Sequence, residues 1–196
     1  SHADVFATLL NITDKLVDYR DGKTYDIVLI DSLWWMAEDL WHGKWISMYQ
    51  RKMQVDNGIA ERYGQNDFED LDRGTGYYNY REAMDYRYMA KTQGLCPPGW
   101  YIPTNKEWKS LVAHIPDGKD PAIFLSKLGD EGVNLAYTGR RFFDWGQSRI
   151  DFGGLYWSST GVFTPFPEEL SIFFYPKDST ELRPVTFTQQ DSVFFL

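Results

Sequence analysis

Histidine and cysteine, the side chains that most often carry catalysis or bind transition metals, are few and scattered in this chain of 196 residues. The three histidines are His2, His42 and His114, and no His-Glu-x-x-His pattern or glycine-rich phosphate loop is present. The single cysteine, Cys96, has no histidine near it in the sequence that could activate it as a nucleophile, so we expect a buried structural thiol. These features predict a protein that is not an enzyme and that holds no resident cofactor.

One acidic stretch is similar in composition to a calcium-binding loop. Asp67, Glu69, Asp70 and Asp72 precede Gly74, but no glutamate stands at the position that closes an EF-hand loop. We expect a solvated loop here, and a Ca²⁺ site is the alternative.

The segment 139–154 interleaves arginines with aromatic residues, which is the composition that recognition surfaces favour. Aromatic rings offer stiff apolar contact area, and an arginine guanidinium offers a planar fork of hydrogen-bond donors. We expect four residues of this segment to bind a ligand: Arg141, Asp144, Trp145 and Arg149. The alternative is that the aromatic side chains tuck under the loop and order it, because long loops often pack on their own side chains.

A helix after Thr104 is the most clearly predicted of the elements that must position these side chains. Thr104 to Glu107 has the pattern of a capping box, in which the threonine hydroxyl and the glutamate carboxylate satisfy backbone donors at the helix start. Apolar residues then follow at helical spacing: Trp108, Leu111, Val112 and Ile115. We expect Pro116 to end this helix and His114 to lie at its surface.

Two other helices are predicted with weaker signals. The spacing of four between Tyr80, Met84 and Tyr88 predicts a helix over 78–92. Asp-Pro at the start of 120–128 predicts a shorter one over that range.

Turn residues and short β-prone runs predict strands at both ends of the chain. Asp-Gly at 21–22 and Asp-Ser at 31–32 bound the runs 25–30 and 33–37, which predict an early β-hairpin. Further β-prone runs follow in the last third: 135–137, 155–158, 170–175, 185–188 and 193–196. Because helices and strands cluster in different parts of the chain, the predicted fold class is α+β.

The organisation is that of one domain over 18–196 with a lead-in over 1–17, for which a short helix and an extended segment are both open. Residues 41–76 are expected to be a long irregular insertion. If the segment 139–154 does not bind the ligand, the next candidates lie in this insertion: Trp41, Trp45 and Tyr49.

Charge and hydropathy exclude some classes of partner. The net charge of −8 without a basic run argues against nucleic acid, because phosphate backbones are bound by Lys and Arg. No apolar stretch approaches the roughly 20 residues that cross a bilayer, so we expect no membrane insertion of the domain itself. The first residues have no signal-peptide pattern, as in the mature form of an exported protein.

Four motifs, in this order, resemble those of the Fibrobacter succinogenes major paralogous domain family. They are DYRDGKTY at 18–25 with WWMAEDL at 34–40, GYYNYREA at 76–83, CPPGWYIPT at 96–104 with EW at 107–108, and YWSST at 156–160. The resemblance runs from about residue 18 to the end of the chain.

The resemblance implies a C-type-lectin-like fold, with two main helices and a twisted antiparallel sheet with long loops. It implies export, as an extracellular, cell-surface or outer-membrane lipoprotein of Bacteroidetes or Fibrobacteres, and it implies no known activity. Ligand surfaces of such folds are built from the loops near the last strands, here 139–154 and 161–169. Four tryptophans of the motifs are expected in the core: Trp34, Trp100, Trp108 and Trp157.

The resemblance also concerns the cysteine. The last strand of family members carries a cysteine, absent from this chain, that would pair with the equivalent of Cys96, so we expect 193–196 to lie beside the segment of Cys96. The Glu-Pro-Asn and Gln-Pro-Asp signatures of calcium-dependent lectins are absent, and one cysteine cannot supply the active-site pair of the related formylglycine-generating enzymes.

We therefore expect a non-enzymatic cell-surface binding module of the adhesin kind, whose partner is a glycan or a surface protein. The alternative is a structural or tip subunit of a surface assembly such as a pilus, and an enzyme is the least favoured function.

Overall fold

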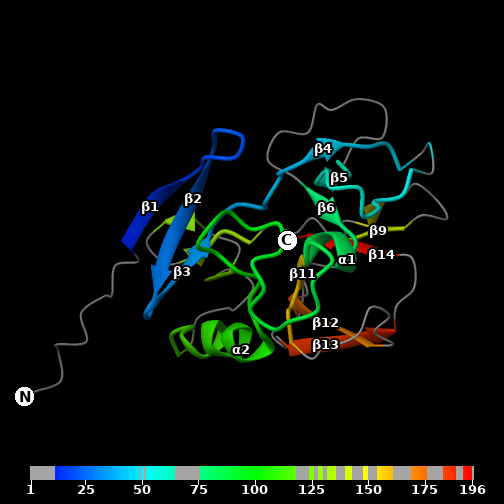
Figure 1. The fold of residues 1–196 in the computed structure, drawn as a ribbon. Helices are drawn as coiled ribbons and strands as arrows, with labels where there is room; N and C mark the ends of the chain where they lie inside the picture. The colour runs from blue at the N-terminus through cyan, green and yellow to red at the C-terminus, as the bar shows by residue number, and fades with distance from the viewer. Residues whose placement is uncertain are drawn as a thin grey trace, which may run out of the picture.

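The computed structural model describes most of the N-terminal half of the chain and shorter stretches of the rest. The described residues are 12–48, 50, 52–64, 76–117, 124–125, 128–129, 132–135, 140–142, 148–149, 154–160, 169–175, 183–188 and 192–195. They form a mixed α+β fold (Figure 1), as predicted. No helix among these residues is long and apolar enough to cross a membrane.

A three-stranded antiparallel sheet lies at the start of the chain. Its strands are β1 (Ile12–Asp18), β2 (Lys23–Ile30) and β3 (Leu33–Met36), in that order. The predicted early hairpin is confirmed as β2 and β3. In the turn between β1 and β2, Gly22 has a positive φ of 75°, which glycine adopts without strain. Of the two alternatives for the lead-in, residues 12–18 take the extended one.

The second sheet is built around the last strand of the chain. Within the described residues its order is β10 (Ser148–Arg149), β9 (Arg140–Phe142), β14 (Ser192–Phe195), β11 (Gly154–Trp157), β12 (Glu169–Tyr175) and β13 (Arg183–Thr188), and β6 (Tyr77–Tyr78) also pairs with β14. Strand β14 is antiparallel to β6 and β9 but parallel to β11, so this sheet is mixed where antiparallel pairing was expected. Four of the five predicted late strands are confirmed as β11 to β14.

The predicted strand at 135–137 is wrong at Leu135. That residue follows a short hairpin of β7 (Leu128–Gly129) and β8 (Gly132–Val133), and its backbone N–H donates to Leu125 O at 2.7 Å instead of joining a sheet. Phe124 and Leu125 are helical, whereas Leu128 already belongs to β7, so the helix predicted over 120–128 does not reach its expected end.

Helix α2 (Asn105–Ala113) confirms the prediction from the capping box. The Thr104 hydroxyl and the Glu107 carboxylate each accept from the backbone of the other residue. The helix ends at Ala113, three residues before Pro116, because His114 N donates to Leu111 O and tightens the last turn. His114 is exposed, as expected.

The helix predicted over 78–92 is wrong, because α1 contains only Tyr80–Ala83. After Met84 the chain leaves the helical region, and Asp85 and Tyr86 both have positive φ. Leu95 N donates to Ala83 O at 3.0 Å, so the returning chain covers the end of α1. Gly94 permits this approach, since a Cβ there would lie 2.2 Å from Ala83 O.

Part of the segment 41–64 belongs to the hydrophobic core, which a peripheral insertion would not. Strands β4 (Lys44–Trp45) and β5 (Glu61–Arg62) pair in parallel, and Met48 and Tyr63 are buried with Tyr77 in the main cluster. The Gln54 side chain is also buried, and its amide donates to the carbonyls of Glu61 and Tyr77.

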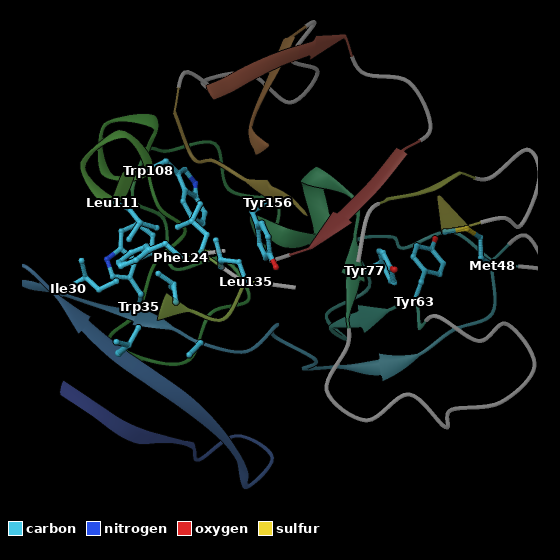
Figure 2. Close-up of a cluster of buried hydrophobic side chains, with 14 of the residues drawn as sticks. Ile30, Trp35, Met48, Tyr63, Tyr77, Trp108, Leu111, Phe124, Leu135 and Tyr156 are labelled. Atoms are coloured by element: carbon cyan, nitrogen blue, oxygen red, sulfur yellow. The ribbon is translucent and has the colours of Figure 1, made fainter. Parts of the chain in front are cut away.

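The main cluster joins α2 to the early hairpin. Trp108 and Leu111 of α2 point toward Trp35 and Ile30 of the hairpin, and Tyr156 of β11 lies beside them (Figure 2). Trp108 and Trp157 are buried as predicted, and Trp100 is half-buried.

Trp34 was expected in the core and is instead 39% exposed. Trp34 and Trp35 are neighbours on β3, and successive side chains of a strand point to opposite faces. Trp35 therefore takes the core position, and Trp34 is directed away from it.

The carboxylate of Glu107 joins the helix cap to two side chains, and this arrangement predicts a pH-dependent stability. It accepts from Thr104 N at 2.8 Å and from Tyr101 Oη at 2.6 Å, and Lys91 Nζ lies 2.9 Å away. Desolvation raises the pKa of Glu107, but these hydrogen bonds outweigh it and lower the pKa to about 2. The stabilisation is thus complete above the ordinary value of 4.5 and is lost as the pH falls toward about 2.

We expect Glu107→Gln to lower the free energy of unfolding by about 1–2 kcal/mol at pH 7, because the charged acceptor is lost. The difference from the wild type should shrink at pH 3. Urea denaturation followed by circular dichroism at both pH values measures it, with Asp117→Asn, an exposed change beyond the same helix, as the control. A difference that is equal at both pH values contradicts this account of Glu107.

Candidate functional site

A pocket lies where the early hairpin, the segment 96–103, residues 134–135 and β11 meet. Its volume is about 80 Å³, enough for several water molecules or for a compact chemical group. The pocket thus joins parts of the chain that are far apart in the sequence but contribute to the two core clusters.

The rim of the pocket is formed by side chains that solvent can reach. It consists of Trp34, Met36, Glu38, Trp100, Tyr101, Pro103 and Asn134, all half-buried or exposed. Trp34 is exposed here because the pleat of β3 turns it to the face opposite Trp35. Three aromatic side chains with accessible surface on one rim are the type of contact area that binding sites favour.

The floor of the pocket consists of packed aromatic side chains. The rings of Trp35 and Trp108 lie 5.1 Å apart between centroids, and those of Trp108 and Tyr156 lie 6.0 Å apart. The indole N–H of Trp108 also donates to Trp157 O at 3.3 Å. These contacts pack the rings of the floor against one another, and the pocket is present without a ligand.

Polar groups are fixed at the pocket by hydrogen bonds to the protein. Tyr156 Oη donates to Asp39 Oδ1 at 3.0 Å, and Asp39 is only 7% exposed. Glu38 Oε2 accepts from Asp26 N at 2.8 Å, and Asn134 Nδ2 donates to Ala37 O at 2.9 Å. Two carboxylates and an amide are therefore held in defined positions.

Cys96 also lines the pocket, and it is buried as predicted. Burial raises the pKa of its thiol to about 12, so the thiolate that a nucleophile requires is not populated at neutral pH. Cys96 contributes apolar contact area and no reactive group.

A second cluster could offer ligands to a metal ion. Among the described residues, the ligand atoms of Asp18, Asp21 and His42 lie within 4.8 Å of one another. Arg20, however, donates to both oxygens of Asp18, and Lys23 Nζ lies 3.4 Å from Asp21 Oδ2. Because two protein cations already face these carboxylates, we regard the cluster as a charge network that closes the β1–β2 turn.

The structure describes only part of the ligand site predicted from the sequence. Arg141 lies in β9 and Arg149 in β10, and the two strands pair as a hairpin in which Ser148 faces Arg141. Asp144 and Trp145 lie outside the described residues, as do the acidic stretch from 67 to 74 and the residues 161–168.

Two of the three further candidates from the sequence lie among the described residues. Trp41 is half-buried, with Lys23 Nζ 3.8 Å from its ring centroid, and Trp45 is half-buried in β4. Tyr49 lies outside the described residues.

Sequence reasoning missed the rim residues Trp34, Glu38 and Asn134. The alternation of a strand at Trp34-Trp35 was the available signal, since it places one of two adjacent tryptophans outside the core. Comparisons of the chain with protein-family models, with curated proteins and with solved structures found no match.

Proposed function

We propose that this protein is a non-enzymatic binding module at the cell surface, and that the pocket at Trp34 and Trp100 holds part of a glycan or protein ligand. The observation that carries the proposal is the rim of accessible aromatic side chains around fixed polar groups. Aromatic rings pack against the apolar faces of sugars and side chains, and carboxylate and amide groups orient the ligand by hydrogen bonds.

We further propose a C-type-lectin-like fold and membership of the Fibrobacter succinogenes major paralogous domain family. The support is that the four motifs contact one another in the folded chain. Tyr156 Oη donates to Asp39 Oδ1 at 3.0 Å, Trp157 Nε1 donates to Tyr78 O at 2.9 Å, and Ser159 Oγ donates to Ile102 O at 2.7 Å. Residues that resemble a family signature thus form one connected framework, which is consistent with a shared core. Export to the cell surface follows from the same proposal.

The proposal predicts that Trp34→Ala weakens ligand binding by about tenfold or more, because an accessible aromatic side chain at a pocket rim supplies much of the contact energy. A glycan array and a pull-down from surface extract identify ligands, and titration of the best one measures the affinity of the variant. Tyr19→Ala is the matched control, since Tyr19 is 91% exposed and does not line the pocket. Equal affinities of the two variants, with folding verified by circular dichroism, would remove the pocket from the binding site.

A further inference from the structure

We propose that Asn57 is a site of spontaneous covalent modification, at which the folded chain converts the side-chain amide to aspartate and isoaspartate. Asn57 is followed by Gly58, and the chain contains no other Asn-Gly pair. The loop that carries the pair comes directly before β5. The inference is independent of the proposed function, because neither residue lines the pocket.

The accessibility of the pair is the first argument. Asn57 and Gly58 are both exposed, so water reaches them. The reaction requires the backbone nitrogen of Gly58 to approach Cγ of Asn57, and glycine hinders this approach least because it has no Cβ. Around Gly58 the described residues leave open space, since a Cβ there would meet no atom within 4 Å beyond its chain neighbours. Its φ of 75° also requires glycine, so the hindrance stays low.

A hydrogen bond to the reacting group is the second argument. Asn57 Oδ1 accepts from Ile59 N at 2.9 Å, which closes a turn over the backbone of Gly58. This bond polarises the side-chain carbonyl and makes Cγ more electrophilic. The same N–H is already placed to stabilise the negative charge that Oδ1 gains when the nitrogen of Gly58 adds to Cγ.

The reaction consumes one water molecule and needs no oxidant and no enzyme. A base from the solvent removes the proton of Gly58 N, and this nitrogen then forms a bond to Asn57 Cγ. The Cγ–Nδ2 bond breaks, and Nδ2 takes up protons from water and leaves as ammonia. Water opens the resulting five-membered imide in one of two ways. Cleavage of the bond between Cγ and the nitrogen gives aspartate, and cleavage at the main-chain carbonyl gives isoaspartate, in which the backbone runs through Cβ and Cγ.

The fold can accept both products, because only the middle of the loop is free of the core. Gln54 is buried, and its amide donates to Glu61 O at 2.9 Å. Ala60 O accepts from Lys44 N at 2.8 Å, which fixes the other end. Residues 55–59 between these points are all exposed. The additional backbone methylene of isoaspartate therefore falls in a stretch that does not pack in the core.

Two other asparagines of the chain serve as internal controls. Asn79 Oδ1 also accepts from a backbone N–H, that of Glu82 at 2.9 Å, but the next residue is Tyr80, which is 2% exposed and begins α1. Asn134 Nδ2 donates to Ala37 O, and the nitrogen of the residue after it, Leu135, donates to Leu125 O at 2.7 Å. In both places the nitrogen that would attack belongs to a residue with a side chain that is held in the fold.

The experiment incubates the folded full-length chain at neutral and at mildly alkaline pH and follows each asparagine by peptide mass spectrometry. We expect Asn57 to gain the mass of amide-to-carboxyl conversion about tenfold or more faster than Asn79 and Asn134, because only there can the reacting atoms approach freely. Labelling by an isoaspartyl methyltransferase should detect isoaspartate at this position. The rate should rise with pH, and circular dichroism should show that the converted protein remains folded.

Two references assign the reaction to the native loop. Asn57→Gln should abolish the mass gain, because its longer side chain would have to close a six-membered ring. A synthetic peptide of residues 53–61 gives the rate without the fold, and the native protein should convert within about tenfold of that rate. A reaction that proceeds only through the unfolded chain would be slower than in the peptide by on the order of a thousandfold or more.

An unmodified Asn57 in the native protein, or a native rate more than about tenfold below that of the peptide, overturns the inference. Conversion of Asn79 or Asn134 as fast as that of Asn57 also overturns it, because the exposed Asn-Gly pair would then have no special role. None of these outcomes bears on ligand binding at Trp34, so the proposed function stands or fails separately.

Discussion

Trp108→Ala is expected to lower the free energy of unfolding by about 3–5 kcal/mol, as for other buried aromatic residues that are truncated. The side chain is 4% exposed and packs between Trp35 and Tyr156. Truncation leaves a cavity at the junction of α2, the early hairpin and β11, and it also removes the hydrogen bond to Trp157 O. Urea denaturation followed by circular dichroism measures the loss.

Trp34→Ala is the matched control for this prediction, because it removes the same side chain from a position 39% exposed. It should cost about 1–2 kcal/mol, in proportion to the smaller area it buries. Trp108 supports the floor of the pocket and Trp34 forms its rim. Trp108→Ala should therefore mainly lower stability, whereas Trp34→Ala should mainly lower ligand affinity. Similar losses in the two variants would mean that the floor is not the packed junction described above.

The parts of this fold that could be predicted from sequence depend on interactions between near neighbours. The capping box of Thr104 and Glu107 and the turn at Gly22 involve residues only a few positions apart, so their side-chain and backbone preferences were sufficient. The helix predicted over 78–92 failed for the opposite reason. Its periodic residues Tyr80 and Met84 are indeed buried together, but the chain from Leu95 returns over the end of α1 and competes with continued helix.

The pocket could not be predicted, because its residues come from five separate places in the chain. Trp34, Trp100, Asn134 and Tyr156 meet only after the hairpin, the segment 96–103 and β11 have packed against α2. Their residue types indicated aromatic contact area, but they did not indicate that these residues lie close together in the folded chain. The predicted site at Arg141 and Arg149 was inferred from local composition alone, and the described residues show there only the backbone of a hairpin.

Asp18 is a buried carboxylate whose main partner is Arg20. It is fully buried, and the Arg20 guanidinium donates to it from Nε at 2.9 Å and from Nη2 at 2.6 Å. Desolvation raises the pKa of Asp18, but the hydrogen bonds and charge of Arg20 outweigh it, so the pKa lies below its ordinary value of 3.8. The pair therefore contributes stability that is complete above the ordinary pKa and is lost as the pH falls below it.

Arg20→Met should accordingly lower the free energy of unfolding by about 3 kcal/mol at pH 7, because it leaves a buried carboxylate without its main partner. Without Arg20, desolvation dominates and the pKa of Asp18 should rise above its ordinary value, so the carboxyl can become neutral in mild acid. The difference in free energy of unfolding between the variant and the wild type should then become smaller as the pH falls from 7 to 4, as measured by urea denaturation.

The double variant Asp18→Asn with Arg20→Met separates the buried charge from other roles of Arg20, which also donates to Leu95 O. If the unpaired charge causes the loss, the double variant should be more stable at pH 7 than Arg20→Met alone and should show no narrowing of its deficit with pH. A double variant as unstable as the single one would instead assign the loss to the bond with Leu95, and hence to the link between the first motif and the segment of Cys96. Either result shows whether Arg20 stabilises the fold by neutralising the charge of Asp18 or by its hydrogen bond to Leu95 O.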